Sequence, residues 1–454
     1  MTTIDQAEWT ILVYIAAHNN LENMGQRSLE QILRVGSTPE LKLAVLYDSS
    51  SGATRYVAGA PGQAALQEPL GKFDSGDPLA LLETTKWAFG RCRAKHYGLV
   101  LWSHGSGWQP EERQRGRGPA DEEGTKAKRV APRARWLSQE VSEVARQTRG
   151  DEAVTLREAK ERAGRPGSMA LFRTSLAQIL KPDNPVERAI CFDDGSAQAL
   201  DTLQLEEVMG KLHTYTKQPL DLLGMDACLM ATLEVAYQIR EHVRYVVASE
   251  ELVPGRSWPY DTILKELRAE PGMAACDLAA RVVRHYVSYY TKNPPRLNYG
   301  DVTKVALDLS RIGELQSAVL RLANALLADR AQATELAAAQ GETQSKESVH
   351  GRRYRSKFDY HLWDLGTLTA SLLTISQSGA VKAAAKGVQQ ALQPGGAVIA
   401  EGHNKPWFAG LGGVSIYLVP PGVQRITPHY SKVALAQDAG WNEMLVKYHK
   451  RWTM

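Results

Sequence analysis

YGLVLWSHGSGW (97–108) and LDLLGMDACLM (220–230) each begin as a short apolar run and end in residues that can carry chemistry. Apolar runs of this length are typical of strands buried on both faces of a parallel sheet. Similar runs, TILVYIA (10–16), LKLAVLYD (41–48) and YVVAS (245–249), are separated by segments with helical spacing. This alternation predicts βαβ units and an α/β fold whose mainly parallel sheet is sandwiched by helices.

The starts of three helices can be proposed from the residues that precede them. Asn19 or Asn20 can cap a helix that continues to residue 35, and Asp77 can cap one over 78–94. Short polar side chains do this by accepting hydrogen bonds from the first free backbone N–H groups. A third helix is expected to begin at Cys228, shortly after the strand 220–225.

Residues 109–190 interrupt this alternation, and we interpret them as an insertion that contains short amphipathic helices. The first part of the insertion lacks apolar periodicity and is expected to be exposed. It carries many basic side chains: Arg113, Arg115, Arg117, Lys126, Lys128, Arg129, Arg133 and Arg135. We expect a catalytic core at 1–300 that includes this insertion, and a mixed α/β C-terminal region at 301–454 packed on the core.

The charge balance argues against a protein that binds nucleic acid or a membrane surface. Lys plus Arg number 54 and Asp plus Glu number 50, a net charge of +4, whereas such proteins usually carry a strong basic excess. The sequence has neither an apolar run of membrane-spanning length nor the N-terminal features of a secretory signal. We therefore expect a cytoplasmic protein whose four cysteines are thiols.

Cys228 and His104 are the residues most suited to catalysis. At a helix start, the helix dipole and the free N–H groups stabilise a thiolate and an oxyanion. His104 follows another strand, and parallel strands end at one edge of a sheet, so imidazole and thiol are expected side by side. Taken singly, Cys228 could be an inert core residue and His104 a hydrogen-bonded structural residue. Their joint placement favours Cys/His chemistry.

Three acidic residues fall near the same sheet edge. Asp226 could lie at the bottom of a pocket and pair with a cationic substrate group, or it could cap the helix expected at Cys228. Both interpretations are open. Glu250 and Glu251 end the strand at 245–249 and could add negative charge to that edge, or they could be ordinary surface charges.

The pairing of W-S-H-G-S-G-W (102–108) with D-A-C-L-M (226–230) resembles the clostripain-like cysteine peptidases of the caspase, gingipain and legumain clan. The family more often has Asp where His18 stands. Four further stretches support the resemblance: WTILVYIAAHNNLE (9–22), YVVASEELVPGRSWPYD (245–261), GGVSIYLVP (412–420) and WNEMLVKYHKRW (441–452). The similarity extends over nearly the whole chain, apart from parts of 109–190 and 341–357.

This resemblance implies a caspase-like fold and a cysteine endopeptidase that cleaves after Arg or Lys. Cys228 would form the acyl-enzyme, and His104 would protonate the leaving amine and later activate water. The backbone N–H groups of Gly105 and Cys228 would form the oxyanion hole. Asp226 matches the family residue that selects a basic P1 side chain, and a carboxylate can bind a guanidinium in bidentate fashion. Glu250 or Glu251 is a candidate for a second such carboxylate.

The resemblance also implies a latent enzyme that is activated by cleavage between His104 and Cys228. The basic loop offers bonds that the enzyme itself would prefer, so we expect self-cleavage within 113–168. The alternatives for this loop are a solvated surface insertion and a docking patch for an acidic partner. Because some relatives depend on calcium, Asp193 and Asp194 are candidate ligands; a turn is the simpler interpretation, and we expect no required cofactor.

We expect protein or peptide substrates, and a regulatory protein is a further candidate partner. Caspase-like prokaryotic proteases act in some cases in regulated cell death or antiviral defence. An α/β-hydrolase would need a G-x-S-x-G elbow and a zinc hydrolase an H-E-x-x-H motif, and neither occurs here. A non-catalytic caspase-like scaffold that binds protein partners is the alternative function, but the presence of both Cys228 and His104 weighs against it.

Overall fold

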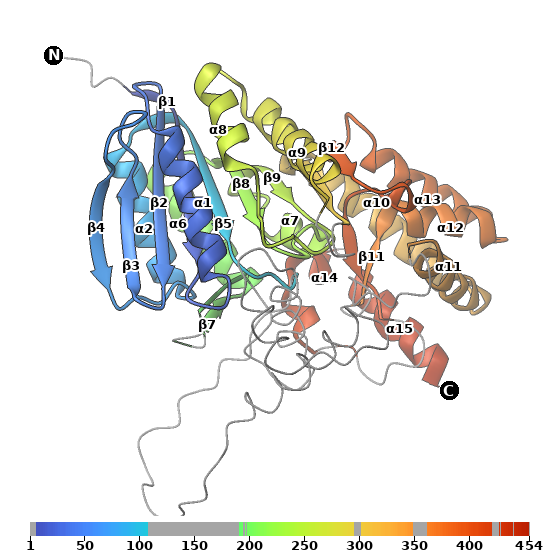
Figure 1. Cartoon of the computed structure of the whole chain (residues 1–454). Helices are drawn as coiled ribbons and strands as arrows, with labels where there is room; N and C mark the ends of the chain where they lie inside the picture. The colour runs from blue at the N-terminus through green and yellow to red at the C-terminus, as the bar shows by residue number, and fades with distance from the viewer. Residues whose placement is uncertain are drawn as a thin grey trace, which may run out of the picture.

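A nine-stranded sheet forms the centre of the molecule, with the strand order β12-β10-β9-β8-β5-β1-β2-β3-β4 (Figure 1). The structure, a computed structural model, describes residues 6–107, 190–193, 196, 198–294, 301–347, 361–419, 426, 428–438 and 440–453. The predicted insertion 109–190 therefore lies outside the described residues, apart from residue 190.

The five central strands are parallel, as the sequence predicted. They are β1 (Ala7–Ala16), β2 (Leu41–Ser49), β5 (Ala94–Trp102), β8 (Leu220–Asp226) and β9 (Val243–Ala248). The outer strands run antiparallel to their neighbours: β3 (Gly52–Val57), β4 (Leu66–Gly71), β10 (Thr303–Asp308) and β12 (Val398–His403). From β1, the chain first adds strands on one side of the sheet and then adds the later strands on the other side. In sheets of this kind, binding sites lie at the carboxyl ends of the strands where this change occurs.

Helices cover both faces of this sheet (Figure 1). One face carries α1 (Glu22–Val35), α8 (Tyr260–Ala269) and α9 (Ala275–Lys292); the other carries α2 (Pro78–Arg91), α6 (Thr202–Thr216), α7 (Leu233–Gln238) and α10 (Ile312–Leu327). The C-terminal part adds α11 (Ala331–Glu347), α12 (Leu365–Ile375), α13 (Gly379–Leu392), α14 (Ala434–Asp438) and α15 (Trp441–Thr453). None of the described helices is long and apolar enough to cross a membrane.

The remaining elements are short. Two small antiparallel sheets pair β6 (Ile190–Asp193) with β7 (Gln198–Leu200) and β11 (Leu362–Asp364) with β13 (Ser415–Tyr417). Within the described residues, 3-10 helices are formed by η1 (Leu309–Arg311), η4 (Pro406–Phe408) and η5 (Pro428–Lys432). The sheet β6–β7 directly follows the long gap in the described residues, and its first residue, Ile190, bridges to Gly105.

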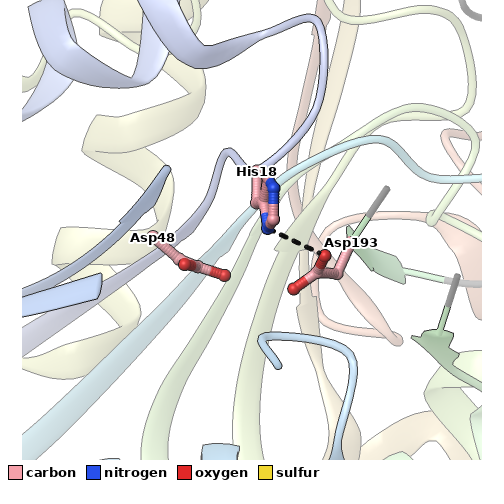
Figure 2. A group of neighbouring side chains, drawn as sticks. All are labelled: His18, Asp48 and Asp193. Atoms are coloured by element: carbon pink, nitrogen blue, oxygen red, sulfur yellow. Dashed lines mark ion pairs between the residues drawn. The ribbon is translucent and has the colours of Figure 1, made fainter. Parts of the chain in front are cut away.

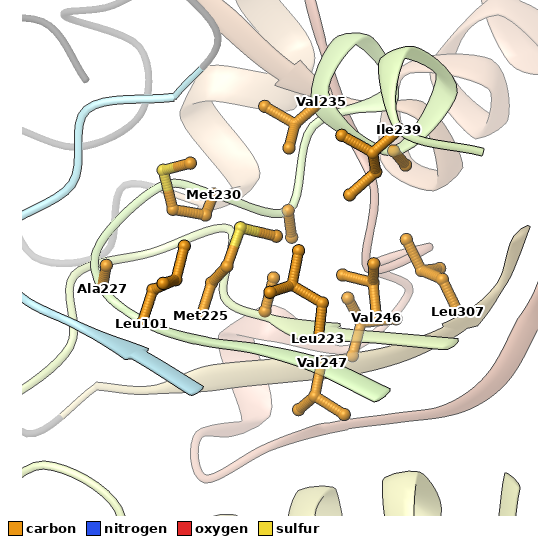
Figure 3. Packing of buried hydrophobic residues seen from close by; sticks show 14 of the residues in the cluster. Leu101, Leu223, Met225, Ala227, Met230, Val235, Ile239, Val246, Val247 and Leu307 are labelled. Carbon is orange, nitrogen blue, oxygen red and sulfur yellow. The ribbon is translucent and has the colours of Figure 1, made fainter. Parts of the chain in front are cut away.

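The core lies between the sheet and the helices. Figure 3 shows Leu223, Val246 and Leu307, from three neighbouring strands, pointing toward Val235 and Ile239 at α7. All five side chains are buried, and burial of each large aliphatic side chain stabilises the fold by about 1.5–3 kcal/mol. This packing fixes the end of β8 against α7, and Cys228 lies two residues beyond that end.

The helix starts were predicted with mixed success. Asp77 caps α2, because its side chain accepts a hydrogen bond from the Leu79 N–H at 2.9 Å. The prediction for α1 was wrong: the helix begins at Glu22 without a side-chain cap. Asn19 instead forms a local turn by accepting the Leu21 N–H at 2.9 Å. The division at residue 300 stays a prediction, although β10 and β12 extend the central sheet.

Candidate active site

His104 and Cys228 lie together because their strands are in register. In the parallel pair β5–β8, the last partners are Trp102 and Asp226, and the Ser103 N–H reaches the Asp226 carbonyl oxygen at 3.4 Å. His104 and Cys228 each follow this pair by two residues. The two parallel strands therefore end at the same level, and both residues follow at the same edge of the sheet. That the imidazole and the thiol lie side by side stays a prediction.

Gly105 packs directly against the backbone of Cys228. A Cβ atom at this position would lie 2.5 Å from the Cys228 carbonyl oxygen and 3.1 Å from its nitrogen. Real Cβ atoms do not approach a carbonyl oxygen so closely, so only glycine allows the two loops to meet. Both proposed oxyanion donors, the Gly105 and Cys228 N–H groups, therefore belong to adjoining backbone segments.

A short segment after β9 covers the Cys228 thiol. The Val253 N–H donates a hydrogen bond to the sulfur at 3.1 Å, and Cys228 has no exposed surface. Two backbone hydrogen bonds fix the same segment to the cysteine loop, from the Leu229 N–H to the Glu251 oxygen at 3.3 Å and from the Ala231 N–H to the Ser249 oxygen at 3.0 Å. The structure therefore describes a closed site in which the sulfur has no exposed surface.

The prediction that a helix begins at Cys228 was wrong. Leu229 adopts a left-handed φ of 63°, and α7 begins only at Leu233, capped by the Thr232 side chain. The chain needs this irregular stretch to turn over the sheet edge. Cys228 therefore receives no stabilisation from a helix dipole, and Asp226 is the last residue of β8 instead of a cap.

Burial keeps both candidate catalytic groups neutral in this closed state. It raises the pKa of the Cys228 thiol to about 12, despite the opposing effects of the Val253 N–H and the Lys304 cation. It also lowers the pKa of His104 to about 3. A neutral thiol is a poor nucleophile, since the thiolate is the reactive form. Activation therefore requires that the site open to water or to a substrate.

Asn20 orients His104, a contact that sequence analysis missed. The His104 Nε2 atom lies 2.9 Å from the Asn20 Oδ1 atom, and His104 is 2% exposed. An amide oxygen at this distance favours the tautomer that carries a proton on Nε2. Strands β1 and β5 are parallel neighbours, so residues beyond the end of β1 lie near those beyond the end of β5. The polar pair Asn19 and Asn20 after β1 was the sequence signal that could have indicated this contact.

Asp226 points into the protein, where three groups donate hydrogen bonds to it. Its Oδ2 atom accepts from the Ser257 hydroxyl, from the Trp258 N–H at 3.1 Å and from the Tyr260 hydroxyl at 2.9 Å. Burial raises the pKa of the carboxyl, and the Lys304 cation opposes that rise. Asp226 precedes Cys228 by two residues in sequence, but its side chain is buried and does not lie on an open surface.

Lys304 is a buried cation that the sequence analysis did not single out. It is 1% exposed, and its Nζ atom lies 4.0 Å from the Tyr286 ring centroid and 5.0 Å from that of Trp258. Burial lowers its pKa to about 7, while Asp226 and Cys228 favour its charged form. Among the residues that the structure describes, none forms a hydrogen bond with the ammonium group. Lys304 therefore offers Asp226 and Cys228 a nearby positive charge.

Glu250 and Glu251 follow β9, as predicted, but their environments differ. Glu250 is 1% exposed and accepts a hydrogen bond from the Ser415 hydroxyl at 2.5 Å. Glu251 is 8% exposed, and its charge contributes to the raised pKa of Cys228. Of the two carboxylates, Glu251 is the one that is closer to solvent and that acts electrostatically on the thiol.

The fold and the paired residues define a class: a caspase-like α/β protein that carries a thiol and an imidazole at one sheet edge. The model of the clostripain family, peptidase family C11, matches residues 13–129 and 178–448. The chain therefore belongs to the clostripain family, and the resemblance seen in the sequence is confirmed. Clostripain of Hathewaya histolytica is 40% identical over 98 residues, which make up 20% of this chain and 18% of clostripain.

Two solved structures have the same overall fold. A secreted C11 cysteine protease from Bacteroides thetaiotaomicron, bound to an irreversible peptide inhibitor, is 18% identical with a TM-score of 0.59, covering 97% of this chain and 99% of that one. An inactive zymogen C11 protease from Parabacteroides distasonis is 15% identical with a TM-score of 0.58, covering 96% and 99%. The caspase-like fold is thus confirmed. The cytoplasmic location stays a prediction, since the Bacteroides protein is described as secreted.

Proposed function

We propose that this protein is a cysteine endopeptidase in which Cys228 is the nucleophile and His104 the proton donor and acceptor. The observation that carries this proposal is the register of β5 and β8, which brings both residues to one sheet edge. Membership of the clostripain family supports the same reaction. A non-catalytic scaffold would have no need for a thiol and an imidazole in this arrangement.

The proposed reaction proceeds by acyl transfer. The Cys228 sulfur attacks the scissile carbonyl carbon while the thiol proton passes to His104; the C–N bond then breaks as His104 gives that proton to the leaving amine. Water, activated by His104, then hydrolyses the thioester. The Gly105 and Cys228 N–H groups are proposed to bind the oxyanion, because their segments adjoin. All of these groups belong to the chain, so the proposed reaction needs no cofactor.

A preference for Arg or Lys at P1 is the second part of the proposal. It rests on the D-A-C-L-M motif and on three acids that end or follow strands β8 and β9, namely Asp226, Glu250 and Glu251. Glu251 is the most exposed of them, so it would meet a substrate cation first. Asp226 would have to exchange one of its internal donors, or its interaction with Lys304, for the substrate cation. The substrates would be proteins or peptides.

Latency is the third part of the proposal, and the covered thiol supports it. Cys228 is fully buried beneath the segment that contains Val253, and burial disfavours its thiolate form. Self-cleavage within 113–168 would release this closed state; those residues lie outside the described part of the chain. One solved relative is itself described as an inactive zymogen. A regulatory protein partner and a role in cell death or defence stay predictions.

The test compares wild type with Cys228→Ala and His104→Gln on fluorogenic peptide amides. We expect hydrolysis by wild type only, with Arg or Lys at P1 preferred over a neutral residue. Equal turnover by wild type and Cys228→Ala would refute the peptidase, and a scaffold would then be the better explanation. Asp226→Ala should lose more activity on Arg substrates than on neutral ones; a uniform loss would indicate a structural role.

Latency is tested separately on a denaturing gel. Wild-type protein should appear as two fragments, whereas Cys228→Ala should stay intact. N-terminal sequencing of the fragments reports the cleaved bond and its P1 residue. Identical nicking of the mutant would show that another protease makes the cut.

A further inference from the structure

Three potential metal ligands converge at the carboxyl edge of the sheet, outside the Cys/His pair. Figure 2 shows His18, Asp48 and Asp193 pointing toward one another from the ends of β1, β2 and β6. One ligand atom from each residue lies within 4.8 Å of the other two. The His18 Nδ1 atom is 3.1 Å from the Asp193 Oδ1 atom. The three side chains thus surround a space of the size that one ion would fill.

Asp48 supplies an independent sign that a ligand is missing. It is 1% exposed, yet neither of its carboxylate oxygens makes a hydrogen bond of standard geometry with any described residue. Among the described residues, two buried carboxylates lie close together here beside one imidazole, an arrangement that a cation would stabilise.

We propose that His18, Asp48 and Asp193 bind a divalent transition-metal cation, such as Mn²⁺ or Zn²⁺. One imidazole nitrogen and two carboxylate oxygens are a ligand set that suits these ions. Ca²⁺ prefers six to eight oxygen ligands, and an imidazole is a poor substitute. This site differs from the calcium site predicted at Asp193 and Asp194, since it uses His18 and Asp48; Asp194 lies outside the described residues.

The residues around this site hold its ligands in place and leave it accessible to an ion. The His18 side chain is 29% exposed, whereas that of Asp193 is fully buried, so an ion can enter past the imidazole and be held from below. Asp193 is also fixed by the Ser75 N–H at 3.2 Å and the Ser196 N–H at 3.1 Å. Such backbone donors orient a carboxylate that also binds a metal.

The site is connected to His104 by two short routes. Asn20, two residues after His18, contacts the His104 ring. Ile190, three residues before Asp193, bridges to Gly105. A bound cation would link β1, β2 and β6, and so would stabilise the backbone on both sides of His104. The ion would act as a structural brace and would take no part in the proton transfers.

The test measures binding of Mn²⁺ and of Zn²⁺ to the full chain in the Cys228→Ala form, which removes the reactive thiol and any self-cleavage. We expect one ion per chain by calorimetry, a rise in Tm with the metal, and an electron paramagnetic resonance signal of bound Mn²⁺. His18→Gln and Asp48→Asn should each weaken binding by about tenfold or more. Asp48→Asn should also raise the Tm of the metal-free protein, because it removes one of two facing carboxylates.

His96→Gln is the matched control. His96 forms a second His–Asp pair, with its Nδ1 atom 3.2 Å from Asp221, but no third ligand is grouped with that pair in the described part of the chain. This variant should bind metal as the parent does. The proposal is overturned if His18→Gln and His96→Gln bind equally well, if no ion binds, or if Ca²⁺ binds more tightly than Mn²⁺ and Zn²⁺. None of these measurements depends on peptidase activity.

Discussion

His104 and Cys228 follow the last register pair of β5 and β8 by the same number of residues, and this equality fixes their proximity. A shift of one residue in that register would move one of the two residues along the strand direction relative to the other, so that they would no longer leave the sheet at the same level. The site therefore depends on the sheet itself more than on the loops.

Replacing Gly105 by Ala should damage both stability and activity. The new Cβ atom would lie 2.5 Å from the Cys228 carbonyl oxygen, so the two loops must separate. We expect a loss of about 1–3 kcal/mol in the free energy of unfolding, measured by denaturant titration. Gly272→Ala is the control, because a Cβ there meets nothing within 4 Å. Equal effects of the two substitutions would contradict this account of the close contact.

Replacing Lys304 by Met should make the Cys228 thiol harder to ionise. The ammonium group opposes the rise in the pKa of Cys228, so its removal should move the pH profile of iodoacetamide alkylation at Cys228 to higher pH. Lys304→Arg retains a positive charge and should leave the profile close to that of wild type. A profile that moves equally in both variants would point to altered packing against Tyr286 and would contradict the electrostatic role.

Replacing Glu251 by Gln should have the opposite effect on the same thiol. The Glu251 charge raises the pKa of Cys228, and the amide removes that charge with little change in size. Alkylation of Cys228 should therefore reach its half-maximal rate at a lower pH than in wild type, as mass spectrometry of the labelled peptide can measure. Alkylation that is slower than in wild type at every pH would contradict this prediction.

Acid should destabilise the protein through His104. The folded pKa of this residue is lowered to about 3, from 6.5, so between these values the unfolded chain binds a proton that the folded chain does not. Stability is thus lost as the pH falls from 6.5 toward 3, by about 1 kcal/mol per pH unit. In His104→Gln this dependence should be shallower over the same range, as urea unfolding at several pH values can test.

The parallel strands and their edge were predictable from sequence, whereas contacts between distant segments were not. Apolar runs at β1, β2, β5, β8 and β9 are long enough to identify, and their order implies a common carboxyl edge. Asn20 and Lys304 reach the site only through the packing of neighbouring strands, and a lysine inside an apolar strand is against the usual preference for burial.

The error at Cys228 had a local cause. Apolar residues after the cysteine suggested a helix, but Cys228 and Leu229 form a turn in which Leu229 has a left-handed φ, and no helix begins before Leu233. Thr232 was the signal that could have placed the helix correctly, since threonine often precedes the first helical residue. The roles of Asp226, Glu250 and Glu251 in substrate recognition could be suggested from sequence, and they stay predictions.

The pairing of β5 with β8 has a consequence for any cut made between them. One product would contain β1, β2 and β5, and the other would contain β8, β9 and β10. The hydrogen bonds between β5 and β8, from the pair Gly98 and Leu222 to the pair Trp102 and Asp226, would still hold the two products together. Severing the polypeptide would then produce a nicked heterodimer that elutes as a single particle of about the original mass. His104 and Cys228 would then lie on different chains, and the active site would form only while the two chains share one sheet.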